Sequence, residues 1–318
     1  MTFAVTNRIP EPAVALLREA GEVRIDEREQ AIPRPDLLEL VRGAEAVLTL
    51  LHDRVDDELL AAAGPQLRCV ANVAVGYDNV DVAAAERRGV TVTNTPGVLD
   101  DATADLTMAL ILAATRRLAE GDRLVRSGRP WSWGMGFMLG SSLQGKRLGI
   151  VGLGGIGTRV AERARAFGME IAYHSRRPSP AEATLEAERL PLADLLAGSD
   201  VVSLHCPLTP ETHHLIGADQ LAAMKPSAVL VNAARGPIVD EAALAAALAE
   251  GRIAAAGLDV FEREPQVEPG LLGLDNVVLT PHLGSATIET RRAMAELAAR
   301  NAISVLRGQG PLTPVASQ

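Results

Sequence analysis

The stretch that decides the fold is KRLGIVGLGGIGTRVAERARAFGMEIAYHSRR, residues 146–177. It opens with an apolar run, Leu148 to Leu153, that has the length of a strand, and a second strand is expected from Met169 to Tyr173. Between these strands, apolar residues recur at the spacing of one helix face: Ile156, Val160, Ala164 and Phe167. Gly168 then ends the helix, because glycine tolerates the left-handed exit conformation. The stretch therefore predicts a strand, a turn, a helix and a second strand, which together form a βαβ unit.

The turn before this helix carries a G-x-G-x-x-G pattern. Gly152 allows the tight turn, Gly154 lets the backbone approach a pyrophosphate, and Gly157 lets helix and strand pack closely. The N-terminus of the helix adds free N–H groups and the positive end of a dipole. Because the pattern lies inside a βαβ unit, it predicts a dinucleotide-binding turn. The alternative is a glycine turn in an α/β sheet that binds nothing.

Composition limits the class of protein and its partners. The 318 residues suggest about two domains, and a net charge of −9 with a pI near 5.3 argues against nucleic acid or an anionic membrane as a partner. Cys69 and Cys206 form no C-x-x-C pair, which favours a reducing compartment. The longest apolar stretch, Leu106 to Ala114, is too short to span a bilayer, and the first residues lack the pattern of a signal peptide. We expect a cytoplasmic protein.

Strands and helices alternate along the chain, which is typical of α/β folds with parallel sheets. Before the glycine turn, strands are expected at residues 3–6, 23–25, 46–51, 68–71 and 90–93. After it, further strands are expected at residues 201–204, 228–232, 254–258 and 277–280. Two longer helices are expected, one from Asp101 to Arg126 and one from Ile288 to Leu306. We predict two doubly wound parallel-sheet domains.

The predicted helix of residues 101–126 has more apolar surface than one domain face needs. The segment after it contains both tryptophans of the chain, Trp131 and Trp133. This combination favours an interface, and two-fold dimers are the commonest closed assembly. We therefore expect a homodimer.

Three later stretches place polar residues just after a strand: N-A-A-R-G at 232–236, D-V-F-E-R-E-P at 259–265 and P-H-L-G at 281–284. In a doubly wound sheet, ligands bind beyond the carboxyl ends of the strands. Four side chains are thus expected to converge on one cleft beside the glycine turn: Arg235, Asp259, Glu264 and His282. Singly, each has a plainer interpretation as a surface cation, a solvated carboxylate or a hydrogen-bonded loop histidine. Together they predict a catalytic site.

The motifs V-G-L-G-G-I-G, H-C-P-L-T-P-E-T, N-A-A-R-G, D-V-F-E-R-E-P and P-H-L-G-S-A-T resemble those of the D-isomer-specific 2-hydroxyacid dehydrogenases. Earlier in the chain, N-V-A-V-G-Y-D-N-V-D and N-T-P-G-V-L-D-D-A-T-A-D resemble the substrate loop and hinge of that family. The resemblance covers nearly the whole chain. It implies a flavodoxin-like substrate-binding domain of residues 1–99 and 288–318, a Rossmann dinucleotide-binding domain of residues 100–287, and an active site in the cleft between them.

The resemblance also implies a reaction, the NAD(P)H-dependent reduction of a 2-oxo acid to the D-2-hydroxy acid by hydride transfer. His282 is then the proton donor, because imidazolium is available near neutral pH, and Glu264 beside it favours the charged form. Arg235 grips the substrate carboxylate in a fork and polarises the carbonyl. The implied substrate contacts are Leu51, the backbone of Val75 and Gly76, Trp133 and Arg235.

The resemblance implies cofactor contacts along the whole dinucleotide domain. The residues concerned are Thr103, Gly152, Gly154, Gly155, Ile156, Gly157, Ser175, Arg176, Arg177, Cys206, Pro207, Thr212, Ala233, Asp259 and Gly284. Among them, Asp259 is expected to fix the nicotinamide carboxamide. No metal is implied, although His205 with Cys206, and His213 with His214, are pairs that a metal site could use.

Cofactor choice depends on the residues after the second strand of the βαβ unit. NAD-selective folds place a carboxylate ~20 residues after the glycine turn, where it accepts hydrogen bonds from the ribose hydroxyls. Here Ser175 stands 18 positions after Gly157 and is followed by Arg176 and Arg177. A serine does not repel a 2′-phosphate, and guanidinium groups bind one in a fork, so we expect NADPH to be preferred, with NADH possible. Alternatively, both arginines are solvated loop cations.

Two positions depart from the family pattern: Gly155 stands where many relatives carry arginine, and Asp100 replaces a more usual neutral hinge residue. The apolar pair Leu50-Leu51 suits a small 2-oxo acid without phosphate, so the chain is expected to be glyoxylate/hydroxypyruvate reductase-like. Trp133 either reaches the site of a partner subunit or packs in an interface. The alternatives are a phosphoglycerate-type dehydrogenase, a nucleotide-sensing corepressor-like binding protein on the same fold, and a methyltransferase that uses the turn for S-adenosylmethionine.

Overall fold

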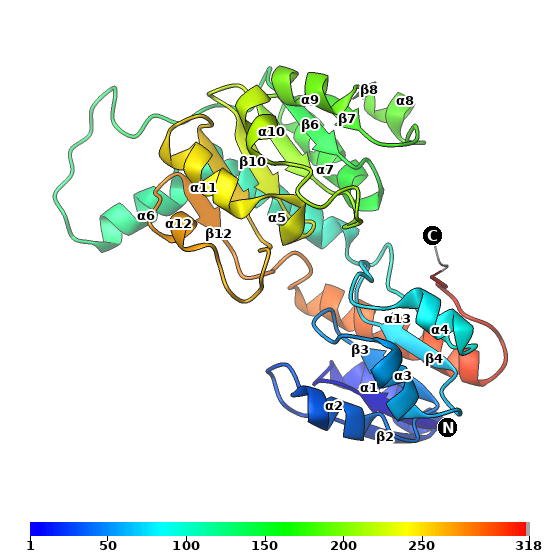
Figure 1. Cartoon of the computed structure of the whole chain (residues 1–318). Coiled ribbons are helices and arrows are strands. Elements are labelled where there is room, and N and C mark those ends of the chain that lie inside the picture. Colours follow the sequence, from blue (N-terminus) through cyan, green and yellow to red (C-terminus); the bar gives the residue numbers. More distant parts are fainter. Residues whose placement is uncertain (316–318) are drawn as a thin grey trace. The chain divides into compact units, whose positions relative to one another are not determined.

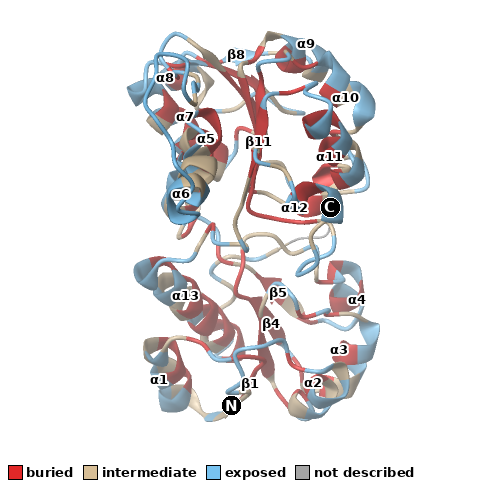
Figure 2. Cartoon of the chain, turned by 90° about the vertical axis from the view of Figure 1, so that its left-hand side faces the viewer, coloured by how far each residue is buried: buried red, intermediate tan, exposed pale blue. Residues whose placement is uncertain are grey.

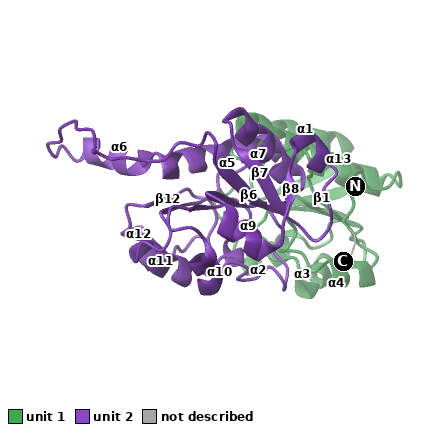
Figure 3. Cartoon of the chain, turned by 90° about the horizontal axis from the view of Figure 1, so that it is seen from above, with its two compact units in different colours: residues 1–99, 286–318 green, residues 100–285 purple. Residues whose placement is uncertain are grey.

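The computed structural model describes residues 1–315 of the chain (Figure 1). These form two compact units, shown in different colours in Figure 3: unit 1 holds Met1–Leu99 and the segment from Ala286 onward, and unit 2 holds Asp100–Ser285. The division predicted from the sequence, 1–99 with 288–318 and 100–287, differs from these units by two residues at its second boundary. The assignment of one unit to substrate and the other to cofactor stays a prediction at this point.

Unit 1 is built on a five-stranded parallel sheet in the order β2-β1-β3-β4-β5. The strands are β1 (Thr2–Val5), β2 (Glu22–Ile25), β3 (Ala46–Thr49), β4 (Cys69–Asn72) and β5 (Thr91–Thr93). The helices are α1 (Glu11–Ala20), α2 (Arg34–Leu40), α3 (Asp57–Ala63), α4 (Val82–Arg87) and α13 (Ile288–Leu306). This order is flavodoxin-like, as predicted. Since α13 packs beside α1, β3 and β4, the C-terminal helix completes a core that the first 99 residues begin.

Unit 2 is built on a seven-stranded parallel sheet in the order β12-β11-β10-β9-β6-β7-β8. The strands are β6 (Arg147–Val151), β7 (Glu170–His174), β8 (Glu188–Arg189), β9 (Val201–Leu204), β10 (Val229–Asn232), β11 (Ala255–Leu258) and β12 (Val277–Leu279). Counted from β6, the strands follow the Rossmann order with one more strand at the edge. The doubly wound fold class predicted from the sequence is therefore confirmed.

Helices cover both faces of the unit 2 sheet, and Figure 2 shows their buried sides turned toward the strands. They are α5 (Asp100–Thr115), α6 (Leu118–Arg126), α7 (Gly155–Ala166), α8 (Glu182–Leu185), α9 (Leu192–Gly198), α10 (Ala218–Ala223), α11 (Glu241–Ala249) and α12 (Pro269–Leu272), with a 3₁₀ turn, η1, at Gly236–Ile238. In the part of the chain that the structure describes, no helix is both long enough and apolar enough to cross a membrane.

The prediction of a single long helix from Asp101 to Arg126 is wrong. It is broken into α5 and α6 at Arg117, which adopts φ +54°. A left-handed arginine carries no sequence signal, because glycine, asparagine and aspartate are the residues that visit this region routinely. The break separates a buried helix from an exposed one, since α5 has eight buried residues and α6 has none. In Figure 1, α6 and the segment after it extend away from the rest of unit 2.

Candidate active site

The glycine turn joins the end of β6 to the first turn of α7. Gly152 adopts φ +96°, a conformation that favours glycine, and a Cβ there would lie 2.7 Å from the backbone nitrogen of Cys206. A Cβ on Gly157 would lie 2.3 Å from the carbonyl oxygen of Gly152. Neither position has room for a side chain. The backbone of the turn therefore packs directly against α7 and against the residues that follow β9.

Gly154, in contrast, has no heavy atom within 4 Å of the place where a Cβ would lie. It is the N-cap residue of α7, so open space lies at a helix N-terminus, where free N–H groups bind anions. The turn also lies between β6 and β9, the point where the strand order reverses and such sheets bind ligands. The residues present fit the diphosphate of a dinucleotide.

A carboxylate lies against the same turn. A Cβ on Gly155 would lie 2.3 Å from Oδ2 of Asp100, the first residue of α5. A side chain at position 155 would therefore require the Asp100 carboxylate to move, so the two departures from the family pattern lie in contact. Burial raises the pKa of Asp100, while the cation of Arg159 on α7 acts in the opposite direction.

The residues predicted to choose the cofactor form the loop after β7. The hydroxyl of Ser175 donates to the carbonyl oxygen of Arg177, and the side chains of Arg176 and Arg177 are exposed. Arg189 on β8 fixes the backbone of this loop, because its Nη2 donates to the carbonyl oxygens of Ser175 and Arg176, at 3.0 and 2.9 Å. Sequence reasoning missed Arg189, because it lies on β8, a two-residue strand without a pattern of its own.

Two other predicted cofactor contacts lie in the loops after β9. Cys206 packs against Gly152 through its backbone, and the hydroxyl of Thr212 donates to the carbonyl oxygen of Pro207 at 2.7 Å. His205 beside them is half-buried. Desolvation lowers its pKa to about 4, and its Nε2 lies 2.8 Å from the hydroxyl of Ser203. Desolvation therefore favours the neutral form of this imidazole.

Asp259, which directly follows β11, fixes the loop after β12. Its Oδ1 accepts hydrogen bonds from Leu283 N and from the hydroxyl of Thr280, each at 2.7 Å, and its Oδ2 accepts one from Gly284 N at 2.8 Å. Thr103 on α5 approaches the same place, since a Cβ on Gly284 would lie 3.3 Å from its Cγ2. Ala233, after β10, is buried. The structure therefore gives Asp259 a role within the protein that the sequence did not predict.

This loop presents His282 to Glu264. The Nδ1 atom of His282 lies 2.9 Å from Oε2 of Glu264, and the histidine backbone has φ +54°, with its nitrogen 2.8 Å from the carbonyl oxygen of Asp259. Such left-handed conformations cluster at functional sites. Glu264 is held in turn by Phe261, whose backbone nitrogen donates to Oε1 at 3.0 Å. Because Nδ1 is engaged, Nε2 is the nitrogen left for a substrate.

The ionisation of Glu264 follows from these contacts. Burial alone raises the pKa of this carboxyl group, but the hydrogen bond and charge of His282 outweigh it, with smaller help from Phe261 N and Arg235. The net pKa lies below its usual value of 4.5. Glu264 is therefore a carboxylate throughout the neutral range, in contact with the His282 imidazole.

Arg235 follows β10 and is joined to the Glu264 loop through its neighbour. A Cβ on Gly236 would lie 1.9 Å from the carbonyl carbon of Phe261 and 2.4 Å from the nitrogen of Glu262. The backbone after Arg235 thus lies directly on the peptide that precedes Glu264. The structure brings Arg235, Glu264, His282 and Asp259 to adjacent strand ends of unit 2, as the sequence predicted from the fold.

The predicted substrate residues Val75 and Gly76 lie in the loop after β4 of unit 1. Both carbonyl oxygens are held by asparagine side chains: Asn94 Nδ2 donates to Val75 O at 2.8 Å, and Asn72 Nδ2 donates to Gly76 O at 3.0 Å. Sequence reasoning missed these asparagines. Asn72 offered a signal, since it is the last residue of a buried strand and directly precedes the loop.

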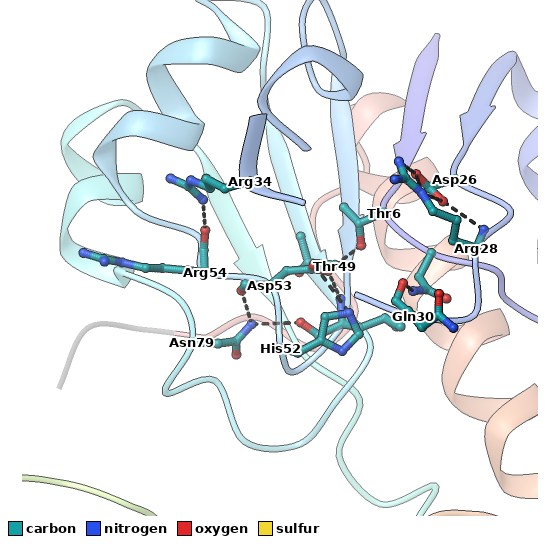
Figure 4. A network of polar contacts seen from close by, with 12 residues as sticks. Thr6, Asp26, Arg28, Gln30, Arg34, Thr49, His52, Asp53, Arg54 and Asn79 are labelled. Carbon is teal, nitrogen blue, oxygen red and sulfur yellow. Dashed lines mark hydrogen bonds and ion pairs between the residues drawn. The ribbon is translucent and has the colours of Figure 1, made fainter. Parts of the chain in front are cut away.

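The loop after β3, which contains Leu51, belongs to the same polar network (Figure 4). Asn79 Nδ2 donates to the carbonyl oxygens of Leu50 and Asp53, at 3.1 and 2.9 Å, and also contacts Asn72. Asp53 is buried and accepts hydrogen bonds from the hydroxyl of Thr6 and from Leu50 N. Burial raises the pKa of Asp53 despite these donors. Hydrogen bonds of Asn79 and Asn72 thus connect the two predicted substrate segments of unit 1, the loops after β3 and β4.

Trp133 lies in the segment that follows α6. It is 78% exposed, and Met135 beside it is 82% exposed. Trp131 stacks on Phe137 with ring centroids 6.0 Å apart, so the segment has internal structure while its large apolar side chains face outward. Figure 2 shows α6 in the colours of exposed and intermediate residues, and none of its residues is buried.

The histidine pairs that could have suggested a metal are otherwise engaged. His213 stacks on His214 at 4.1 Å, and Nε2 of His214 lies 2.5 Å from Oε1 of Glu262. Within residues 1–315, no group of three or more histidine, cysteine, aspartate or glutamate side chains is arranged to hold a metal ion.

Comparison with known proteins decides the family. The family model described as "D-isomer specific 2-hydroxyacid dehydrogenase, NAD binding domain" matches residues 108–284. The glyoxylate reductase of Pyrococcus furiosus is 53% identical over 317 residues, which is 98% of this chain and 94% of that protein. The chain belongs to the D-isomer-specific 2-hydroxyacid dehydrogenases. It is an NAD(P)-dependent dehydrogenase, in agreement with the motifs quoted above.

Solved structures agree with this assignment. A glyoxylate reductase from Paecilomyes thermophila superimposes with a TM-score of 0.90 at 36% identity, over 99% of this chain and 98% of that one. An NADPH-dependent glyoxylate/hydroxypyruvate reductase from Sinorhizobium meliloti, in complex with NADP and malonate, gives a TM-score of 0.86 at 37% identity, over 99% and 96%. The dehydrogenase fold therefore extends over essentially the whole chain.

Proposed function

We propose that the protein reduces glyoxylate and hydroxypyruvate to the corresponding 2-hydroxy acids, with the D configuration where the product is chiral, and with NADPH as the preferred reductant. The observation that carries this proposal is the 2.9 Å contact between His282 Nδ1 and Glu264 Oε2. A histidine oriented by a carboxylate on one nitrogen is suited to donate a proton from the other. The names of the relatives support the substrate class, and the NADP complex of one of them supports the cofactor.

When bound, the nicotinamide supplies the hydride that reduces the carbonyl carbon. His282 then transfers the Nε2 proton to the carbonyl oxygen as negative charge develops there. Glu264 stabilises the imidazolium before the transfer. Arg235 holds the substrate carboxylate through its planar guanidinium and stabilises the developing oxyanion. The backbone N–H groups of Val75 and Gly76 complete the carboxylate site in this proposal.

The loop after β3 supports a substrate without a phosphate. Leu51 is 39% exposed and offers an apolar surface. The nearby basic side chains already have acidic neighbours: His52 Nε2 lies 3.6 Å from Asp53 Oδ1, and Arg54 Nε lies 3.0 Å from Asp56 Oδ2. A phosphorylated 2-oxo acid would find no unpaired cation among these residues, which argues against the phosphoglycerate-type alternative.

An absorbance assay at the reduced-nicotinamide band tests the proposal directly. NADPH and NADH are each combined with glyoxylate, hydroxypyruvate, pyruvate and phosphohydroxypyruvate. Glyoxylate and hydroxypyruvate with NADPH are expected to give the highest kcat/KM. Highest activity on phosphohydroxypyruvate would overturn the substrate, and a lack of turnover on all four acids would favour the corepressor-like binding protein.

The pH dependence of reduction should change in Glu264→Gln. The wild-type pair needs an ionised Glu264, whose pKa is lowered because the contact with His282 outweighs the effect of burial, and a protonated His282, whose loss of the proton ends reduction as the pH rises. Without the carboxylate, the imidazolium is lost earlier, so the alkaline limit of kcat/KM should fall by about 1 pH unit. The measurement is the pH profile of glyoxylate reduction for both proteins. An unchanged alkaline limit would remove Glu264 from this role.

We also propose that the enzyme is a two-fold symmetric dimer. The support is the exposed apolar surface of α6 and the segment after it, where Leu118, Val125 and Trp133 are 57%, 63% and 78% exposed, more than isolated surface residues explain. Light scattering at assay concentration should give about twice the 33.4 kDa of one chain. An active protein with the mass of a single chain would contradict the dimer and any role of Trp133 across it.

A further inference from the structure

The loop of residues 261–268 carries Glu264 to His282, and a buried carboxylate holds this loop from α11. Glu241, the first residue of α11, is only 4% exposed. Its Oε1 accepts a hydrogen bond from the backbone nitrogen of Glu262 at 2.6 Å, and its Oε2 accepts one from that of Glu268 at 3.3 Å. Two distant points of the loop are therefore tied to one side chain.

The contacts also run in the opposite direction. Glu262 Oε2 accepts a hydrogen bond from the backbone nitrogen of Glu241 at 3.4 Å, and its Oε1 contacts His214. Two consecutive backbone amides thus donate hydrogen bonds to two different carboxylates: Phe261 N donates to Glu264, and Glu262 N donates to Glu241. Because these amides are neighbours in one backbone, the bond that fixes Glu262 also limits how far Phe261 and Glu264 can turn.

We propose that Glu241 is a positioning residue for the reduction, which holds the 261–268 loop so that Glu264 meets His282. This inference rests on the proposed role of the His282–Glu264 pair. A buried carboxylate is unfavourable unless hydrogen bonds satisfy it. Here both oxygens of Glu241 accept hydrogen bonds from the backbone of the loop that carries Glu264. A side chain that only filled this space would be apolar.

Charged side chains lie near Glu241 and near the His282–Glu264 pair. Glu262 and Glu268 face Glu241, with His214 bound to Glu262 and Arg263 3.7 Å from Glu268. Burial raises the pKa of Glu241, its backbone donors lower it, and the two neighbouring carboxylates raise it further. On the other side of the loop, Arg235 and His282 are the cations that act on Glu264. Among the described residues, the hydrogen bonds given for the side chain of Glu241 are to backbone groups of the loop, so its influence on His282 has to pass through the loop.

The test uses Glu241→Ala and Glu241→Gln, each alone and together with Glu264→Gln. Both single variants should lower the alkaline limit of glyoxylate reduction, with Glu241→Ala approaching the shift of about 1 pH unit expected for loss of the carboxylate partner. In the Glu264→Gln background neither change should move the limit further, because the group that Glu241 positions is already gone. A second readout without turnover is the pH at which the His282 imidazole titrates by NMR, with its resonance assigned from His282→Ala.

Asp240→Ala is the matched control. Asp240 is the N-cap of the same helix, and its side chain accepts from Ala243 N rather than from the loop. It should lower the melting temperature and leave the pH limit unchanged. If Glu241→Ala does not fold, Glu241→Gln, which keeps one acceptor oxygen, decides the question. A pH limit that does not move in Glu241→Gln, or that moves equally in the Glu264→Gln background, overturns the inference. Wild-type activity in His282→Ala overturns the proposed function itself.

Discussion

His282→Ala is expected to lower kcat for glyoxylate reduction by roughly 10²–10⁴, the usual value of general acid catalysis. Without the imidazole, the carbonyl oxygen has to take its proton from water while the hydride arrives. The effect should appear in kcat, since the interaction strengthens as charge develops on the oxygen. Steady-state kinetics at saturating NADPH measure it.

Two controls separate chemistry from folding in this variant. The dissociation constant for NADPH, followed by its fluorescence, should change little, because the glycine turn does not involve His282. His213→Ala removes an exposed imidazole that stacks on His214 and should keep wild-type kcat. Activity close to wild type in His282→Ala would exclude this histidine as the proton donor.

The double variant Ser175→Asp with Arg176→Ala is expected to reverse cofactor preference. The new carboxylate accepts from the ribose hydroxyls of NADH and repels a 2′-phosphate, while the loss of Arg176 removes a charge-assisted hydrogen bond. Together these changes should shift the ratio of kcat/KM for NADPH and NADH by roughly 10²–10³, given about 1.5–3 kcal/mol for one hydrogen bond to a charged group and a further repulsive contribution.

The cofactor experiment compares kcat/KM for both cofactors in the parent and in the variant. Arg252→Ala serves as the control, because Arg252 is an exposed arginine that pairs with Glu250 and precedes β11, at the amino ends of the strands. A parent enzyme that already prefers NADH would refute the interpretation of Ser175, Arg176 and Arg177. It would leave the family and the reaction class unaffected.

The fold was predictable because its decisive contacts are encoded by residue type. Gly152 and Gly157 leave no room for a Cβ, and the apolar runs at residues 201–204, 228–232 and 254–258 match β9, β10 and β11, whose residues are all buried. The polar residues after β10, β11 and β12 could be grouped for the same reason, since parallel strands end at one edge of the sheet. The family resemblance then extended the prediction to both units.

What escaped prediction depends on contacts between segments far apart in the chain. Asn79 holds the loop after β3 from 26 and 29 residues away, and Glu241 reaches loop residues 21 and 27 positions later. Neither residue type is unusual at its position, because an asparagine in a loop and a glutamate in the first turn of a helix are common. The break at Arg117 is similar, since its left-handed backbone is imposed by the surrounding structure rather than by the residue itself.

The packing of Gly236 on the Phe261 peptide has a consequence for how this enzyme can change. Gly236, which follows Arg235, touches the backbone that leads to Glu264, at a distance that admits no Cβ. In the proposed function, Arg235 binds the substrate carboxylate and Glu264 supports the proton donor. The position of Arg235, which is proposed to bind the substrate, and the position of Glu264, which is proposed to set the pKa of the proton donor, are therefore coupled through this backbone contact. A natural or engineered variant that shifts Arg235 to admit a larger 2-oxo acid would also displace Glu264, so a wider substrate range should come at the cost of a changed pH optimum.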